Sequence, residues 1–313
     1  MAEFTWTFDA PTGTYKSHAM SSRLYEAAME NSVFMDHVRP VDGYGRNSGE
    51  TVTLTRIANI TEPTSAVLSE SVRIPEDEFS ISTRSITVQE LGRAVPYTNL
   101  SQDLSKFDTE NPIQRKLKDQ MRLVLDTLAA TAFKETAIKY QITGASAATI
   151  TTNGTFGGAA TANMNIYHVE EIRDYMYDTL RAPTIGGDYV GIFRTLGLRG
   201  IKRDADWEEW HKYTDPTVKW NGEVGRIESV RFIETNHANA LGKVGTGSVL
   251  GEGVIFGEDS VAMAEAMSPE LRAAIPGDFG RSKAVAWYGI LAMEPIWETG
   301  NAGEAKIVHV GSA

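Results

Sequence analysis

Side chains that could perform acid–base chemistry are concentrated in the stretch GEVGRIESVRFIETNHA, which runs from Gly222 to Ala238. Glu228 and Glu234 could form a carboxylate pair, with His237 beside them, as in glycoside hydrolysis. On a strand the two carboxylates would share a face but lie about 20 Å apart, at ~3.3 Å per residue. Hydrolase pairs need roughly 5 to 9.5 Å. On a helix they would be about 9 Å apart along the axis and on different sides. The pattern therefore favours a strand with solvated charges over a catalytic rim.

A second acidic cluster lies in DADWEEWHKY and could bind a metal ion. Its candidate ligands are Asp204, Asp206, Glu208, Glu209 and His211. It lacks the His-Glu-x-x-His order that places two histidines on one helical face. The alternative is an amphipathic helix whose Trp207 and Trp210 are packed or lie at an interface, with the acids in water. We favour this alternative.

The remaining motifs do not identify a reaction. GEGVIFG, at residues 251–257, has neither the G-x-G-x-x-G spacing nor a P-loop lysine, so ordinary turn glycines are the simpler interpretation. A G-x-S-x-G nucleophile elbow does not occur, and the six histidines are scattered along the chain. The sequence therefore assigns no catalytic, cofactor-binding or metal-binding residue, and we predict that the chain is not an enzyme.

Composition limits the class of protein further. The 313 residues are enough for one elaborated domain or about two domains. The chain has no cysteine, which excludes disulfides and thiolate metal sites. A net charge of −11 argues against a sequence-reading nucleic-acid binder, although it is compatible with a protein that surrounds DNA and holds it weakly. We expect no secretory signal and no membrane-spanning segment.

The first half of the chain predicts an extended structure followed by a long helix. Residues 1–49 indicate an arm with one short helix near SSRLYEAAME. Residues 50–91 predict a long two-stranded excursion, with a bulge or strong twist near residues 83–85, that should lie on a neighbouring subunit. Asn111 as N-cap and Pro112 at the first position predict a helix over about 112–140. Its apolar stripe is Ile113, Leu117, Met121, Val124, Leu128 and Ala132.

The second half predicts mixed elements, so the fold class is α+β. A loop or weak hairpin precedes a helix over 166–181, with Ile166, Val169, Ile172, Met176 and Leu180 inward. Strands are expected at 188–195, 247–257, 283–297 and 305–311, and helices at 198–215 and 258–267. Asn221–Gly222 predicts a hairpin turn. Ile227, Val230 and Phe232 should then face apolar neighbours.

The order of these elements resembles that of tailed-bacteriophage major capsid proteins, and most closely the N-four-like podovirus capsid family, which has the Hong Kong ninety-seven type fold. The segments that carry the resemblance are ELGRAVPYTNLSQDL before the long helix, WNGEVGRIESVRFIET, IFGEDSVAMAEA and WYGILAMEPIW. The resemblance covers about residues 50–310.

The resemblance implies a division of the chain. Residues 1–49 would be the N-terminal arm, 50–91 the extended E-loop, 92–183 the peripheral (P) domain with its spine helix, and 184–285 the axial (A) domain. Residues 286–313 would be C-terminal strands that return to the P domain.

The implied function is self-assembly into hexamers and pentamers of an icosahedral head that encloses double-stranded DNA. The implied partners are other copies of the chain, portal and scaffolding or decoration proteins, and non-specifically contacted DNA. The implied location is the virion, after assembly in the host cytoplasm. An encapsulin-like cellular shell of the same fold and an unrelated hydrolase or binding domain remain as alternatives.

Overall fold

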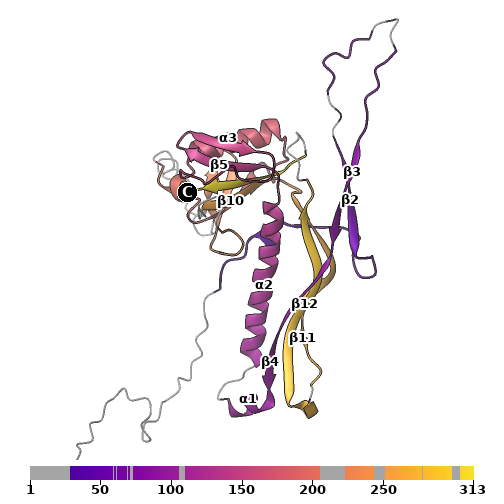
Figure 1. The fold of residues 1–313 in the computed structure, drawn as a ribbon, viewed down its shortest axis with the longest axis vertical. Coiled ribbons are helices and arrows are strands. Elements are labelled where there is room, and N and C mark those ends of the chain that lie inside the picture. The colour runs from indigo at the N-terminus through magenta and orange to yellow at the C-terminus, as the bar shows by residue number, and fades with distance from the viewer. Residues whose placement is uncertain are drawn as a thin grey trace, which may run out of the picture.

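The computed structural model describes residues 29–58, 60, 62–68, 70, 73–105, 110–204, 223–242, 251–276, 278–297 and 304–313. Within these residues the chain forms a compact head, a long stalk around one helix, and a projecting hairpin (Figure 1). The predicted turn at Asn221–Gly222 and most of the two predicted helices at 21–30 and 198–215 fall outside the described residues. The mixture of helices and strands confirms the α+β class.

The head is built on a mixed sheet. Among the described residues the sheet has seven strands, in the order β6-β5-β13-β10-β7-β9-β8. Their bounds are β5 Lys139–Gly144, β6 Ala147–Thr151, β7 Tyr189–Arg194, β8 Glu223–Ile227, β9 Val230–Thr235, β10 Gly251–Phe256 and β13 Ile307–Ser312. The two central strands, β10 and β13, are buried along their whole length. The last strand of the chain therefore lies inside the head.

One amphipathic helix packs on this sheet. It consists of α3 (Ile166–Asp174), which continues as the π-helical turn η2 (Tyr175–Thr179). The predicted inward residues are all buried: Ile166, Val169, Ile172, Met176 and Leu180. They join Tyr140 and Phe193 of the sheet in one apolar cluster, so this prediction is confirmed.

The stalk consists of a second sheet and the long helix α2 (Glu110–Lys134). The sheet order is β1-β11-β12-β4. Its strands are β1 Arg39–Pro40, β4 Gln89–Thr98, β11 Val261–Ala273 and β12 Ser282–Pro295. Leu117 of α2 is buried against Val285 and Trp287 of β12. The other described elements are short: η1 (Phe34–His37), α1 (Asn99–Leu104), α4 (Arg199–Lys202) and η4 (Asp278–Gly280).

The long helix differs from its prediction at both ends. It includes Asn111 and Pro112 within its first turn rather than at the cap and first position, and Gln114 Nε2 donates to Glu110 Oε1 at 3.1 Å. It ends at Lys134 rather than near residue 140, because Lys139 begins β5, which pairs with β13. The predicted stripe is confirmed, since every member of it is at least partly buried.

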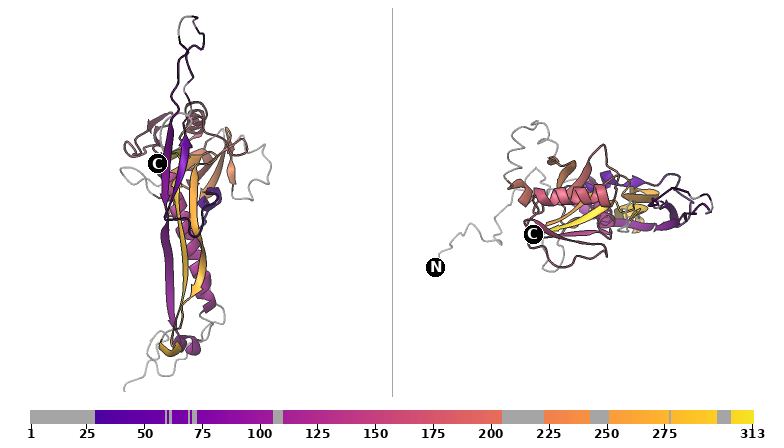
Figure 2. Two further views of the ribbon diagram at one scale, coloured as in Figure 1. Left: turned by 90° about the vertical axis from the view of Figure 1, so that its right-hand side faces the viewer. Right: turned by 90° about the horizontal axis from the view of Figure 1, so that it is seen from above.

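The hairpin of β2 (Thr51–Ile57) and β3 (Ile81–Thr87) extends beyond the head along the long axis (Figure 2). Its register runs without a shift from Thr51↔Thr87 to Ile57↔Ile81. Of the two predicted alternatives, the bulge is therefore wrong, and the strong twist stays a prediction. The apolar residues Ile81 and Ile86 break the alternation of β3 because they lie on opposite faces of the strand. Ile86 is buried against the body, whereas Ile81 is exposed on the opposite face.

Two further predictions in the second half are wrong. The segment 258–267 is not a helix, because residues from Val261 onward form β11 and pair with β12. The prediction of one strand through Glu228 and Glu234 is also wrong. The chain turns between β8 and β9 at Glu228 and Ser229, whose φ values of 44° and 62° are left-handed. The prediction that Ile227, Val230 and Phe232 face apolar neighbours is confirmed, since all three are buried.

Candidate assembly surfaces

The hairpin carries the most extensive exposed apolar surface among the described residues. Seven large apolar side chains along β2, β3 and the connection between them are more than half exposed: Ile57, Ile60, Val67, Leu68, Ile74, Phe79 and Ile81. Val67 is 88% exposed. Exposed apolar side chains gathered on one projecting segment mark a candidate interaction site. We refer to these seven residues as the hairpin apolar set.

The base of the hairpin is firmly attached to the body. Ile86 is completely buried and packs with Ala262 and Ala264 of β11. Arg84 Nη2 lies 2.9 Å from Glu294 Oε2 of β12, and Arg56 Nη1 donates to the carbonyl of Ile296 at 3.1 Å. The hairpin therefore presents one face to its own subunit at the base and leaves its outer part available to another molecule.

A second exposed apolar surface lies at the far end of the stalk. It consists of Leu100 and Leu104 of α1, Phe279 of η4 and Ile275, which lies between β11 and η4. Asn99 joins the two parts, since its backbone N–H donates to Arg281 O at 3.0 Å and its side chain to Gly280 O at 2.7 Å. Figure 1 shows α1 and the β11–β12 connection meeting at this end. We call these four residues the stalk-tip apolar set.

The proposed carboxylate pair is not assembled into a site. Glu228 is exposed in the turn between β8 and β9. Glu234 lies on β9, and its carboxylate forms an ion pair with Lys202. His237 is buried and its Nδ1 lies 2.8 Å from Asp126 Oδ2. A turn separates the two glutamates, so the assumption that they share one strand is wrong. The sequence did not indicate Asp126, which is 111 residues away.

The acidic cluster and the glycine-rich segment are the other two candidate sites. Of the acidic cluster at 204–213, only Asp204 lies within the described residues. Throughout the described part of the chain, no group of three or more His, Asp or Glu side chains is arranged so that it could hold a metal ion. Residues 251–256 form the buried strand β10, and a Cβ at Gly253 would lie 2.0 Å from the Phe193 ring. That glycine is needed for packing and leaves no room for a phosphate.

Buried polar side chains form an internal network in the head that the sequence did not reveal. His309 Nε2 lies 2.8 Å from Glu252 Oε1, and Lys139 Nζ lies 3.0 Å from His309 Nδ1. Burial lowers the pKa of His309 to about 4 and that of Lys139 to about 8. Burial tends to raise the pKa of Glu252, but the hydrogen bond from His309 and the charge of Lys134 lower it overall. This geometry fits a neutral imidazole that accepts from the ammonium and donates to the carboxylate.

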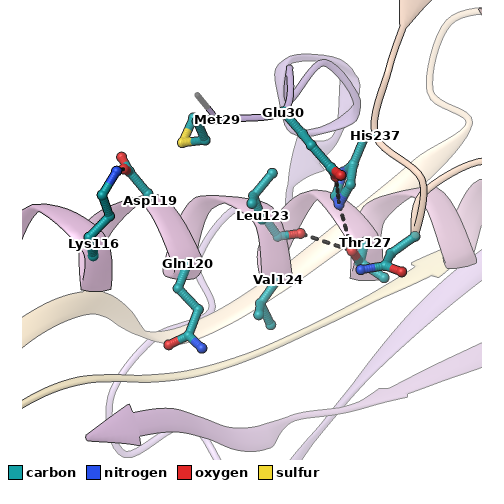
Figure 3. A pocket seen from close by; sticks show the side chains of 10 residues that line it. Met29, Glu30, Lys116, Asp119, Gln120, Leu123, Val124, Thr127 and His237 are labelled. Carbon is teal, nitrogen blue, oxygen red and sulfur yellow. Dashed lines mark hydrogen bonds and ion pairs between the residues drawn. The ribbon is translucent and has the colours of Figure 1, made fainter. Parts of the chain in front are cut away.

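A cavity of about 560 Å³ opens beside the exposed flank of α2 (Figure 3). Its apolar part includes Met29, Leu123 and Val124, and its polar part includes Glu30 and His237. Thr127 Oγ1 also lines the cavity, 3.4 Å from His237 Nε2, but its hydroxyl donates to the Leu123 carbonyl at 2.9 Å and not to the imidazole. No helix in the described ranges is long and apolar enough to cross a membrane.

Comparison of the structure with solved structures gives matches over almost the whole chain. Neither a protein-family model nor a curated protein matches the sequence. The capsid of cyanophage Pam1 superposes with a TM-score of 0.70 at 15% identity, covering 100% of both chains. The head structure of Helicobacter pylori bacteriophage KHP40 gives 0.71 at 12% identity over 94% of each chain. The capsid of Ralstonia phage GP4 gives 0.64 at 14% identity over 98% of this chain and 97% of that one.

These matches define the fold as the phage capsid fold of the Hong Kong ninety-seven type, as the resemblance of the sequence predicted. The projecting hairpin, the long helix along a narrow sheet and the compact head are its parts (Figure 1).

Proposed function

We propose that the chain is a structural, non-catalytic major capsid protein of the N-four-like podovirus type, which self-assembles into the hexamers and pentamers of an icosahedral phage head. The observation that carries the proposal is the hairpin, which is anchored at its base and exposes its apolar set on the outside. A lone hairpin has marginal stability in water, so this one needs a partner surface. A neighbouring copy of the same chain supplies it.

Burial of the hairpin apolar set supplies the attraction between subunits. Completely burying one such side chain contributes roughly 1.5–3 kcal/mol, which is offset by the entropy lost on association and ordering. A single contact is therefore modest. A head-to-tail contact that closes into a ring repeats around each capsomer, and multivalency makes the closed shell stable.

We assign the parts of the fold to capsid domains as follows. The β2–β3 hairpin and its connection are the E-loop, within residues 50–91. The stalk, made of α2 with β1, β4, β11 and β12, is the P domain. The head sheet with α3 is proposed as the A domain at the centre of each capsomer. This proposal differs from the division that the resemblance implies, because α3, β5, β6 and β13 move from the P domain to the A domain, and β11 moves from the A domain to the P domain. The sheets support the change, since β5, β6 and β13 belong to the head sheet and β11 to the stalk sheet. Residues 1–49 are proposed as the N-terminal arm, of which β1 pairs with β11 in the stalk sheet.

The stalk-tip apolar set is proposed to join neighbouring capsomers. It lies at the opposite end of the stalk from the head, so a capsomer centred on the heads would carry these four residues at its periphery (Figure 1). The proposed further partners are a portal protein, scaffolding or decoration proteins, and double-stranded DNA. With a net charge of −11, contact with the DNA would be weak and non-specific. Assembly would take place in the host cytoplasm and the product would be part of the virion.

Purified particles distinguish this function from that of a cellular shell with the same fold. Particles from infected or co-expressing cells should contain nuclease-protected double-stranded DNA or a scaffolding protein. Mass spectrometry that found a stoichiometric enzyme cargo and no DNA would favour the encapsulin-like alternative. A hydrolase activity lost on substituting Glu228, Glu234 and Glu209 with Gln would overturn both.

A further inference from the structure

Positive charge is concentrated on one stretch of the long helix α2. From Arg115 to Arg122 the helix carries four cations, Arg115, Lys116, Lys118 and Arg122, and a single acid, Asp119. All four cations are exposed. Lys116 and Asp119 pair with each other at 3.5 Å. Because the whole chain has a net charge of −11, the sign of the charge is reversed locally along this part of the stalk.

Three of these cations lie on the side of α2 that faces away from the stalk sheet. The helix runs along one side of the stalk (Figure 1), and Leu117 marks the side that is buried against β12. At about 100° per residue, Arg115, Lys118 and Arg122 lie roughly 100–160° around the helix from Leu117. Along the axis they span about 10 Å, at ~1.5 Å per residue. We call these three residues the α2 cation row.

Two members of the row lack the acidic partner that other exposed cations of the stalk have. Lys118 forms no ion pair with a described residue. Arg122 donates from Nε to the neutral hydroxyl of Ser32 at 2.8 Å. By contrast, Arg272 and Arg281 each pair with an acid, at 2.8 and 3.5 Å. The positive charge of the row is therefore available to a partner outside the chain.

An open groove of about 570 Å³ runs beside part of the row. Lys118 and Arg122 line it together with apolar side chains such as Met121, and Asp36 is the one acid among the described lining residues. Arg115 lies on the preceding turn of the helix and is not part of the groove. Because the row continues past the groove on exposed side chains, it fits a partner that lies along the outside of the helix better than a segment that fills the groove.

The partner that suits a short row of exposed cations is a polyanion with closely spaced charges. Double-stranded DNA carries one phosphate charge per about 1.7 Å of its axis, so a row about 10 Å long faces roughly six phosphates. Exposed Lys and Arg side chains contact phosphates without reading the base sequence. The net negative charge of the chain repels DNA elsewhere and so directs the contact to this row.

We propose that the α2 cation row is the surface through which the chain contacts the phosphates of double-stranded DNA. The contact is non-specific and weak, because a few cations act against a net charge of −11. The choice of DNA as the partner rests on the proposed function. The surface itself belongs to one chain, so its binding is testable without assembly.

DNA binding by the full-length chain, at a concentration below that at which particles form, tests the row. Fluorescence anisotropy of a labelled duplex gives the association constant between about 50 and 200 mM salt, and each phosphate contact contributes about −0.9 to the slope of log K against log salt. The double substitution Lys118→Gln with Arg122→Gln should make this slope less negative by about 2. The matched control is Arg272→Gln with Arg281→Gln, which removes as many cations from paired positions of the same stalk and should keep the wild-type slope.

Lys118→Gln alone keeps the test valid if the double variant is unstable. Its side chain has no ion pair with a described residue to lose, and the slope should become less negative by about 1. Thermal unfolding verifies that each variant is folded. Equal slopes for the two double variants, or no binding of the duplex by the wild type, would overturn the proposal.

Two further measurements separate this proposal from others. Polyglutamate that bound the chain more tightly than the duplex at the same salt concentration would overturn it in favour of an acidic protein segment as the partner. Negative-stain electron microscopy of the same variants reports assembly independently, and the double variant should still form particles. If the wild type formed none, the proposed function would fail, whereas the salt slopes of the unassembled chain would still decide whether the row binds phosphates.

Discussion

Arg84 on β3 and Glu294 on β12 form the ion pair that fixes the projecting hairpin to the stalk. Nη2 of Arg84 lies 2.9 Å from Glu294 Oε2, and Nε donates to the same oxygen at 3.0 Å. Only 20% and 30% of the two side chains are exposed. Since 210 residues separate the two partners, the pair sets the angle at which the hairpin leaves the body.

Replacing Arg84 by Met should loosen this attachment. Glu294 would keep its charge in a partly buried place without this donor, at a cost of about 1–3 kcal/mol in the free energy of unfolding. Urea unfolding of the unassembled chain measures the change. Arg73→Met is the matched control, because Arg73 is 83% exposed and pairs with Glu76, which is 73% exposed. Equal effects of the two substitutions would show that Arg84 does not anchor the hairpin.

Removing the outer part of the hairpin should separate folding from assembly. Ile57 and Ile81 are cross-strand partners, so residues 58–80 can be replaced by Asn-Gly, which forms a two-residue turn. The shortened chain should keep the circular dichroism spectrum of the wild type, because the buried clusters lie outside the deleted residues. It should form no particles in sedimentation experiments. Loss of the folded spectrum, or particles of normal size, would contradict the role given to the hairpin.

Phe279→Ser tests the stalk-tip apolar set. Phe279 is completely exposed, so the substitution should change the free energy of unfolding by no more than about 0.5 kcal/mol. If the tip joins capsomers, the variant should still form hexamers but should require a higher protein concentration to form closed shells. Light scattering against concentration measures this threshold. An unchanged threshold concentration would show that the tip does not take part in the contacts between capsomers.

The buried His309 makes the head sensitive to acid. Burial, partly offset by the hydrogen bond to Glu252, lowers the pKa of His309 to about 4 from an unfolded value near 6.5. Between these values the unfolded chain binds more protons than the folded chain, so stability falls as the pH falls from about 6.5 to about 4. The loss should reach up to about 3 kcal/mol.

Unfolding of the unassembled chain at several values of pH verifies this window. His309→Gln removes the titrating group, so its free energy of unfolding should depend less on pH between 6.5 and 4. The lowered pKa of Glu252 adds a loss of the same sign at lower pH, once that carboxylate is protonated. If His309→Gln and the wild type lose stability in parallel, the histidine is not the cause.

Elements with a strong local pattern were predictable from the sequence. The apolar stripe of α2 and the buried face of α3 follow from helical periodicity. The inward side chains of the hairpin, Val52, Leu54 and Ile86, follow from alternation along its strands. The strand β11 was not predictable, because Ala, Met and Glu favour a helix and only its pairing with β12 overrides that preference. The turn at Glu228 and Ser229 lacks the glycine or asparagine that normally indicates left-handed backbone.

The candidate surfaces were only partly predictable. The length of the β-excursion indicated that it needs a partner, whereas its anchor depends on Arg84 meeting Glu294 from a distant part of the chain. The stalk-tip apolar set joins α1 to residues near position 279, which have no common local signal. Glu30, Asp126 and His237 likewise come together only in the tertiary fold.

Negative-stain electron microscopy of the purified full-length chain, at increasing concentration, tests the central claim most directly. The account predicts ring-shaped capsomers or closed shells for the wild type, and isolated subunits for the chain whose residues 58–80 are replaced by Asn-Gly. A wild-type chain that stayed monomeric and compact at high concentration would contradict it.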